Sequence, residues 1–361
     1  MRLFIDCRYV RPRVHDGISR YTASLVNAVA DKAEVTMLIH DPEQLNQLPD
    51  LPHVLISSPT GPKEPFVARQ INPHSPDVVF SPMQTMGSLG RRYRLILTLH
   101  DLIYYQHRTP PRNLPAPVRL GWRLYHLSYV PQRLTLNRAD AVATVSQTTA
   151  ELIAEHRLTS RPVHLIPNAP QAGAQPRNPR QPPTHDLVYM GSFMDYKNIP
   201  ALIAAINELP GYRLHLCSPI DGATRARLTA LALRPGQLVF HNGIDEWEYH
   251  QLLQRATALV TLSHAEGFCL PVVEALSHGT PVITSDLPIF REVTGSAART
   301  YGAQVINSDD PTGFAAAVRA LENPRDFATA SSAARARSQD YSWAESAARL
   351  LALAESLTRT D

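Results

Sequence analysis

The sequence predicts an α/β protein with two domains, each built on a doubly wound parallel sheet. Strand-like apolar runs alternate with helical stretches in both halves of the chain, a rhythm typical of βαβ units. A proline-rich stretch separates the two halves. The length of 361 residues is enough for two domains that each bury a core of their own. In such sheets ligands bind outside the carboxyl ends of the strands, so functional side chains are expected there.

The first domain is predicted over residues 1–166. Helices are expected near 20–30, over 118–138, and after Ser146, whose hydroxyl suits a helix N-cap. The strands are expected at the apolar runs 3–6, 35–40, 78–81, 95–100, 141–145 and 163–166.

Residues 167–185 are predicted to be an interdomain linker, because neither a helix nor a central strand tolerates their proline density. The second domain is predicted over 186–341. Residues 342–361 should form a final helix, anchored by Trp343, that could pack back on the first domain. The strands of the second domain are expected at 187–190, 213–217, 238–241, 259–262 and 281–284.

Composition and charge restrict the class of protein. Hydrophobic residues make up 44% and charged residues 19% of the chain, as in an ordinary globular protein. A net charge of +3 is too balanced to require a nucleic-acid partner. The three cysteines are far apart and form no CxxC pair, which indicates a reducing compartment and no zinc site. With no apolar run of membrane-spanning length, we expect a cytoplasmic protein that could lie on the inner face of the membrane.

Two carboxylates lie eight positions apart around a glycine turn and a helix start. Glu266 precedes the turn, Pro271 is suited to the first helical turn, and Glu274 follows about one turn inside the helix. The N–H groups of residues 267–270 would then converge at a helix N-terminus, where a diphosphate binds well. Glu274 would reach a ribose and Glu266 a hexose. The alternative is a buried helix with solvated acidic side chains.

Lysine is rare in this chain, which makes Lys197 stand out. Only three of the 35 basic residues are lysine. Lys197 follows the glycine turn at Gly191, between a strand end and a helix entry, so its ammonium group would stabilise a departing diphosphate. Alternatively, Lys197 is only a surface residue of the turn and forms an ion pair with Asp195.

Two features of the first domain are also candidates for the site. Gly17 lies between the first strand and the first helix, where the backbone could approach the same diphosphate; a plain turn is the alternative. His100 and Asp101 follow a strand at its carboxyl end. The imidazole could bond a sugar hydroxyl, while Asp101 orients the ring or caps the following turn. A structural histidine is an equally good interpretation of His100 alone.

Several motifs are absent from the sequence. No Asp-x-Asp pair is present, which argues against a metal under the diphosphate. No GxGxxG follows the first strand and no GxxxxGK occurs, which argues against dinucleotide oxidoreductases and P-loop NTPases.

Arginine and aromatic residues interleave over residues 108–133, which raises the prospect of contact with anionic lipid headgroups. We favour burial instead, because apolar residues recur here at helical spacing on two faces. The arginines are Arg108, Arg112, Arg119, Arg123 and Arg133, and the apolar residues are Val118, Leu120, Trp122, Leu124, Tyr125, Leu127 and Tyr129.

These motifs resemble glycosyltransferase family 4, the retaining glycosyltransferases of GT-B fold. The most specific piece is segment 263–292, in which Glu266 and Glu274 form the family's Glu-x7-Glu motif. Weaker support comes from residues 16–21, 100–101 and 191–198. The resemblance covers most of the chain. It implies the GT-B architecture, in which two Rossmann-like domains face a central cleft, and transfer that keeps the anomeric configuration.

The resemblance also implies roles for individual residues. Glu274 would bind the donor ribose and Glu266 the donor sugar's hydroxyls, while Lys197 would neutralise the leaving group. His100 would contact the sugar, so His100, Lys197 and Glu266 would be the catalytic residues. The donor-binding residues would be Gly17, Gly191, Ser192, Lys197, Glu266, Glu274 and, through backbone N–H groups, Gly267, Phe268, Cys269 and Leu270.

The chain departs from the family at two positions. Many members carry arginine where this chain has Ser192, and glycine where it has Cys269, so the basic clamp would rest on Lys197 alone. Serine there also occurs in members similar to mannosyltransferases, which favours GDP-mannose as donor. No metal or cofactor is expected. The acceptor would be a hydroxyl of a glycan, a glycolipid or a small molecule, selected by loops such as 82–92 and 104–117. A nucleotide-sugar epimerase of the same fold and a non-catalytic sugar-nucleotide-binding protein remain open alternatives.

Overall fold

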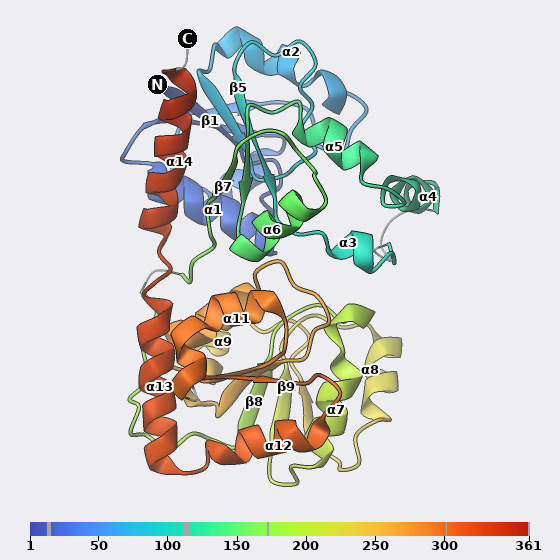
Figure 1. Ribbon diagram of the computed structural model, residues 1–361, viewed down its shortest axis with the longest axis vertical. Helices are drawn as coiled ribbons and strands as arrows, with labels where there is room; N and C mark the ends of the chain where they lie inside the picture. The colour runs from blue at the N-terminus through green and yellow to red at the C-terminus, as the bar shows by residue number, and fades with distance from the viewer. Residues whose placement is uncertain (13–15, 111–115, 172, 301, 360–361) are drawn as a thin grey trace. The chain divides into compact units, whose positions relative to one another are not determined.

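The chain folds into two compact units. The computed structural model describes residues 1–12, 16–110, 116–171, 173–300 and 302–359. Unit 1 consists of Met1–Asn168 together with Ser342–Asp361, and unit 2 of Ala169–Tyr341 (Figure 1). Residues 111–115 of the predicted acceptor loop 104–117, Arg112 among them, lie outside the described residues.

Unit 1 contains a seven-stranded, all-parallel sheet in the order β3-β2-β1-β4-β5-β6-β7. The order reverses between β1 and β4, which pair through Ile5 and Phe80, so the loops that follow these strands diverge there. The central strands are buried on both faces, which explains why they read as unbroken apolar runs. The strands are β1 (Arg2–Asp6), β2 (Glu34–Ile39), β3 (His53–Leu55), β4 (Val78–Ser81), β5 (Arg94–Leu99), β6 (Ala141–Thr144) and β7 (Val163–Leu165).

Helices cover this sheet, and one of them comes from the end of the sequence. Helix α14 (Trp343–Thr358) packs against α1 (Gly17–Val29), with the Trp343 ring 5.9 Å from that of Tyr21. Ser346 Oγ donates to the carbonyl of Pro167 at 2.7 Å. The remaining α-helices of unit 1 are α2 (Ala68–Ile71), α3 (Ile103–Gln106), α4 (Ala116–Tyr125), α5 (Val130–Leu136) and α6 (Gln147–Glu155), the last capped by Ser146 as predicted.

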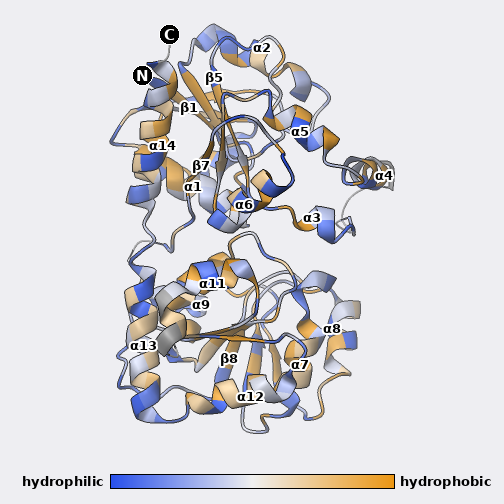
Figure 2. Cartoon of the chain, in the orientation of Figure 1, coloured by the Kyte–Doolittle hydropathy of each residue, from blue (hydrophilic) through white to orange (hydrophobic). Residues whose placement is uncertain are grey.

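Unit 2 repeats the architecture with a six-stranded parallel sheet, in the order β10-β9-β8-β11-β12-β13. The strands of this sheet carry many orange, apolar residues, whereas the helices around them carry both blue and orange residues (Figure 2). The strands are β8 (Asp186–Tyr189), β9 (Arg213–Leu216), β10 (Leu238–Phe240), β11 (Ala258–Thr261), β12 (Val282–Ser285) and β13 (Ala303–Ile306). The α-helices are α7 (Ile199–Asn207), α8 (Gly222–Thr229), α9 (Glu246–Arg255), α10 (Leu270–Ser277), α11 (Pro288–Thr294), α12 (Pro311–Ala320) and α13 (Pro324–Ser338).

The proline-rich stretch 167–185 forms no helix or strand in its described residues. It is nevertheless held against unit 2 from Ala169 onward. The buried Arg177 donates to the carbonyl of Ala256 at 2.6 Å and lies over the Phe327 ring at 4.5 Å. Much of this stretch is therefore part of unit 2.

The prediction of one long buried helix over 118–138 is wrong in two respects. The helix is broken into α4 and α5, because Pro131 fits only the first turn of a helix. The leucines are also not buried: Leu120, Leu124 and Leu127 are 60%, 59% and 59% exposed. The spacing was helical, but it marked a solvent-facing stripe rather than a core face. Among the described residues, no helix is both long and apolar enough to cross a bilayer.

Candidate functional site

The N-terminal end of α10 offers several unpaired backbone donors. α10 begins at Leu270, one residue before Pro271, and its N-cap Cys269 has left-handed backbone angles, with φ 68° and ψ 72°. The Cys269 side chain caps no N–H group. None of the N–H groups of residues 267–270 has a hydrogen-bond acceptor among the described residues. Such a helix end favours an anion.

Lys197 and Glu266 form an ion pair next to this helix end. Nζ of Lys197 lies 2.6 Å from Oε1 of Glu266, and the side chains are only 14% and 7% exposed. Burial disfavours the ammonium form, but the Glu266 carboxylate together with the neighbouring Tyr189, Cys269 and Tyr196 side chains outweighs it and raises the pKa of Lys197. Lys197 is therefore charged at neutral pH. The predicted alternative partner, Asp195, is exposed and is replaced by Glu266.

Hydroxyl groups from β11 and the loop after it hold Glu266 in place. Ser263 Oγ donates to Oε1 of Glu266 at 2.8 Å, so its own oxygen accepts from Thr261 Oγ1 at 3.0 Å. The N–H of His264 donates to the carbonyl of Tyr196 at 2.7 Å, which ties the Glu266 loop to the Lys197 loop. Ser263 was not among the predicted site residues, because a lone serine at a strand end carries no motif.

A buried tyrosine shapes the turn that precedes Lys197. The Tyr189 hydroxyl donates to the carbonyl of Ser192 at 2.7 Å. The N–H of Gly191 donates to Ser218 Oγ at 3.0 Å. A Cβ atom at Gly191 would lie 2.7 Å from the Tyr189 hydroxyl oxygen, so any other residue would force the turn or the Tyr189 ring to shift. Ser192, in contrast, is exposed.

The remaining predicted residues of unit 2 differ in accessibility. Glu274 lies in the second turn of α10 and is only 4% exposed. Phe268 is buried, and its ring packs edge-on against that of Tyr341 at 5.5 Å, so its side chain has a structural role. Gly267 is buried, while Cys269 and Leu270 are partly exposed. An anion from solvent would therefore reach this helix end most easily beside Cys269 and Leu270.

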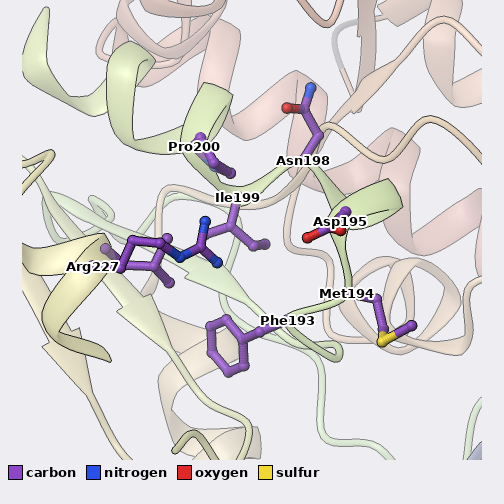
Figure 3. Close-up of a pocket in the computed structure, with 8 residues that line it drawn as sticks. Phe193, Met194, Asp195, Asn198, Ile199, Pro200 and Arg227 are labelled. Atoms are coloured by element: carbon purple, nitrogen blue, oxygen red, sulfur yellow. The ribbon is translucent and has the colours of Figure 1, made fainter. Parts of the chain in front are cut away.

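A small cavity lies beside the Lys197 turn, with a volume of about 120 Å³. Phe193, Asp195 and Ile199 line one part of it, and Arg227 reaches in from α8 (Figure 3). Arg227 was not predicted, because a single arginine in a helix has no distinguishing pattern.

In unit 1, Gly17 is the first residue of α1. The side chain of Asp16 accepts from the N–H of Ser19 at 2.9 Å and caps the helix. A methyl group at Gly17 would meet no atom within 4 Å. The glycine is therefore not required for packing.

His100 is held at the carboxyl end of β5 by the backbone. Its Nε2 lies 2.7 Å from the carbonyl of Pro82, and its ring packs edge-on against Tyr21 at 5.1 Å. Burial lowers the pKa of His100 to about 4. The neutral ring must donate from Nε2, since a carbonyl only accepts, so Nδ1 carries a lone pair. Asp101 caps the following turn by accepting from the N–H of Ile103 at 3.0 Å.

The structure thus brings Gly191, Lys197, Glu266 and the start of α10 together in unit 2. Gly17 and His100 belong to unit 1. No group of three His, Cys, Asp or Glu side chains that could hold a metal occurs among the described residues. Metal independence stays a prediction.

Comparisons with known proteins match both units. The family model "Glycosyl transferases group 1" matches residues 174–338, and "Glycosyltransferase Family 4" matches residues 15–169. The O-antigen chain mannosyltransferase B of Escherichia coli is 26% identical over 91% of this chain and 92% of its own. The O-antigen chain mannosyltransferase RfbU of Salmonella typhimurium is 28% identical over 54% of each protein, so this chain spans about half of that relative's length.

The fold is shared with a solved structure that is distant in sequence. A sucrose-phosphate synthase from Thermosynechococcus elongatus superposes with a TM-score of 0.77 over 100% of both chains, at 19% identity. The two family models together cover most of the sequence, and both predicted parallel-sheet domains are present. The chain therefore belongs to the glycosyltransferases of GT-B fold that are similar to family 4.

Proposed function

We propose that this protein is a retaining hexosyltransferase that moves mannose from GDP-mannose to a hydroxyl group of a glycan or glycolipid. In the reaction the bond between the sugar C1 and the β-phosphate oxygen breaks, and a bond from the acceptor oxygen to C1 forms. The acceptor's proton passes to the departing diphosphate, which leaves as GDP. The protein's task is to bind the diphosphate and to stabilise the charge that develops on it.

The observation that carries the proposal is the buried ammonium of Lys197 beside the open start of α10. The unpaired N–H groups of residues 267–270 supply dipoles that favour an anion. Lys197 adds an ammonium group whose charge Glu266 partly balances and whose remaining N–H donors can bind a phosphate. Together they favour the leaving diphosphate more than the bound sugar ester, because the charge on the phosphate grows as the bond breaks.

Glu266 serves both Lys197 and the donor sugar in this proposal. One of its oxygens accepts from Lys197 and from Ser263, which fixes the orientation of the carboxylate. The Lys197 ammonium has three N–H donors, so it keeps donors for a phosphate while it stays paired with Glu266. The second carboxylate oxygen of Glu266 accepts a hydroxyl of the sugar. Glu274, one helix turn after the start of α10, accepts a ribose hydroxyl.

We assign donor contacts to two residues of unit 1 as well. The Nδ1 lone pair of His100 accepts a hydrogen bond from a sugar hydroxyl, since Nε2 is committed to Pro82. The open space above Gly17 admits a phosphate close to the backbone. The reaction needs no metal ion, because Lys197 and the N–H groups carry the compensating charge.

The preference for mannose rests on the relatives that are mannosyltransferases and on Ser192, where many family members carry arginine. The acceptor is a glycan or glycolipid because the O-antigen relatives act on such chains according to their names. We place the protein in the cytoplasm, where it contacts the membrane surface through unit 1.

A thermal-shift series with GDP-mannose, UDP-glucose and ADP-glucose tests the donor. A ligand that binds only the folded protein stabilises it by about 2.7 kcal/mol at a hundredfold excess over its dissociation constant. We expect GDP-mannose to give the largest shift, with EDTA present. If none of the three nucleotide sugars raises the unfolding midpoint, the proposal is contradicted.

Incubation with GDP-mannose and alkyl hexosides, followed by NMR, tests the reaction. A retaining transferase releases GDP and forms an α-mannoside, which has the same anomeric configuration as the donor. An epimerase changes the donor's sugar without any acceptor present. A protein that only binds sugar nucleotides shows the thermal shift but releases no GDP.

A further inference from the structure

Arg8 places a guanidinium group completely inside unit 1, two residues after the end of β1. Its side chain is 0% exposed, and all five of its N–H donors have acceptors. The Asp6 carboxylate accepts from Nε and Nη2 at 2.8 and 3.0 Å, and the Glu64 carboxylate accepts from Nη1 and Nη2 at 2.6 and 3.0 Å. The fifth bond runs from Nη1 to the carbonyl of Ser57 at 3.0 Å. The guanidinium group therefore has no donor left for a ligand and acts only through these neighbours.

Stability alone is a weak reason for this group of buried charges, which we call the Arg8 cluster and which consists of Arg8, Asp6 and Glu64. Charges lose their hydration when they are buried, and apolar side chains of similar volume often stabilise a protein equally well. The cluster lies at the carboxyl end of β1, beside β4, where the strand order of the sheet reverses. Sheets of this class bind their ligands at that position, which connects the cluster with ligand binding.

The two carboxylates of the Arg8 cluster hold both ends of segment 81–87, which begins at the last residue of β4. Oδ2 of Asp6 accepts from Ser81 Oγ at 3.2 Å, and the same Oγ accepts from the N–H two residues later at 3.3 Å. At the other end, Oε1 of Glu64 accepts from the N–H of Gly87 at 3.1 Å. A Cβ atom at Gly87 would collide with the backbone of Glu64, so the segment lies directly against the cluster.

Segment 81–87 in turn holds two sets of polar groups of unit 1. The carbonyl of Pro82 lies 2.7 Å from Nε2 of His100 and so fixes the orientation of that ring. The hydroxyl groups of Tyr9 and Thr85 are 2.8 Å apart and share a hydrogen bond. Thr85 is exposed and Tyr9 is partly exposed, so both hydroxyl groups are available to a hydroxyl of a sugar.

We propose that Arg8 is a positioning residue for sugar transfer that acts through segment 81–87. By fixing this segment it fixes the His100 ring and the Tyr9–Thr85 hydroxyl pair, which binds the acceptor. The proposal rests on the function proposed above, in which His100 accepts from a sugar hydroxyl. The guanidinium group is a rigid fork, so it sets the distance between the two carboxylates of the cluster and thereby between the ends of the segment.

Arg8→Lys tests the proposal without removing the positive charge. A lysine has all its donors on one nitrogen and cannot pair bidentately with both carboxylates. With the full-length protein, GDP-mannose and an alkyl hexoside, we expect kcat/KM for the acceptor to fall about tenfold to a hundredfold. The affinity for GDP should equal that of the wild type, because Lys197 and the start of α10 belong to unit 2.

A second variant and a matched control separate positioning from stability. Ser81→Ala cuts the link between Asp6 and the segment but leaves the ion pairs of Arg8 in place, so it should show the same loss of kcat/KM with an unchanged GDP affinity. Arg177→Lys is the same substitution at a buried arginine of unit 2. This control should lower the unfolding midpoint but keep the wild-type kcat/KM.

The tautomer of His100 provides a measurement that needs neither donor nor acceptor. In protein labelled with ¹⁵N-histidine, the His100 signals are identified by their loss in His100→Gln. In the wild type at neutral pH we expect the proton on Nε2 alone, since the Pro82 carbonyl only accepts. Arg8→Lys and Ser81→Ala should show a mixture of both tautomers, because the carbonyl no longer has a fixed place.

Three results would overturn the proposal. One is a wild-type His100 tautomer in folded Arg8→Lys and Ser81→Ala proteins. Another is a changed tautomer combined with wild-type kcat/KM. The third is an equal loss of kcat/KM in Arg177→Lys, which would assign the effect to general destabilisation. If Arg8→Lys does not fold, Ser81→Ala decides the question.

Failure of the transferase function is a distinguishable outcome. A wild-type protein that transfers no mannose contradicts the function proposed above. The ¹⁵N spectra still decide whether Arg8 positions the His100 ring.

Discussion

Lys197 Nζ lies 2.6 Å from Oε1 of Glu266 although the two residues are 69 positions apart in the sequence. The pair joins the turn after β8 to the loop after β11, strands that are neighbours in the sheet of unit 2. Because both side chains are mostly buried, removal of either one would leave the other charge buried without its partner. The same two residues thus stabilise the site's loops and provide its charge.

Removal of the ammonium should therefore affect stability and activity in different ways. Lys197→Met leaves Glu266 buried without its partner, so we expect the free energy of unfolding to fall by about 2–4 kcal/mol. The double variant with Glu266→Gln should regain much of that stability but stay inactive. We expect transfer to fall about 10²–10³-fold or more in both. Chemical denaturation and donor turnover provide the measurements.

Lys32→Ala is the control for this experiment, because Lys32 is exposed. It should leave stability and turnover unchanged. Full turnover by a folded Lys197→Met protein would remove the leaving-group role of Lys197.

Gly17 and Gly222 form a matched pair for testing a ligand contact. Each is the first residue of a helix, follows an aspartate N-cap, and has no atom within 4 Å of an added methyl group. Alanine at either position should fold normally. We expect Gly17→Ala to weaken donor binding at least tenfold, since the methyl group enters the space proposed for a phosphate. Gly222→Ala should bind the donor as the wild type does. Titration calorimetry with GDP-mannose compares them; equal affinities would leave Gly17 as an ordinary helix start.

Gly191→Ala should destabilise unit 2 through a steric clash. The added Cβ would lie 2.7 Å from the buried Tyr189 hydroxyl oxygen, so the turn has to shift. We expect a loss of about 1–3 kcal/mol in the free energy of unfolding. Tyr189→Phe removes the clashing oxygen, so the double variant should lose less than the two single losses added together. Strictly additive losses would show that the clash is not the cause.

The lowered pKa of His100 predicts a dependence of stability on pH. The ring stays neutral in the folded protein down to about pH 4, while the unfolded chain takes up a proton near pH 6.5. The unfolded state therefore binds more protons between these values, and the free energy of unfolding falls as the pH falls through this window. For one group the slope is at most about 1.4 kcal/mol per pH unit.

Denaturation curves between pH 4 and pH 7.5 measure this slope. His100→Gln should flatten the curve, and the exposed His53→Gln should not. If both variants keep the wild-type slope, the acid sensitivity arises from other groups.

Most strands of both sheets were predictable, and the central ones most clearly, because they are short apolar runs buried on both faces, as β4 and β11 illustrate. The edge strands β3 and β13 were missed, since each is short and only partly apolar. The exposure of the leucines of α4 was not predictable either. Helical spacing identifies a stripe of leucines, but only the tertiary contacts of Tyr104 with Trp122 decide which face is buried.

In the candidate site, too, some features were predictable from the sequence and others were not. The Glu-x7-Glu spacing and the rarity of lysine identified Glu266, Glu274 and Lys197 as candidates. Their pairing was not predictable, because Asp195 is nearer to Lys197 in sequence while Glu266 is nearer in space. Ser263 and Arg227 were missed, since a serine or an arginine becomes conspicuous only through what it contacts.

The origin of α14 in the last residues of the sequence has a consequence for biosynthesis. Its buried side chains, Leu350 and Ala347 among them, complete the core of unit 1, whereas all of unit 2 is encoded earlier. A nascent chain can thus finish unit 2 while unit 1 still exposes the surface of α1 that α14 covers. The part translated first is the part that matures last, and it stays open to chaperones and proteases until the ribosome has made α14.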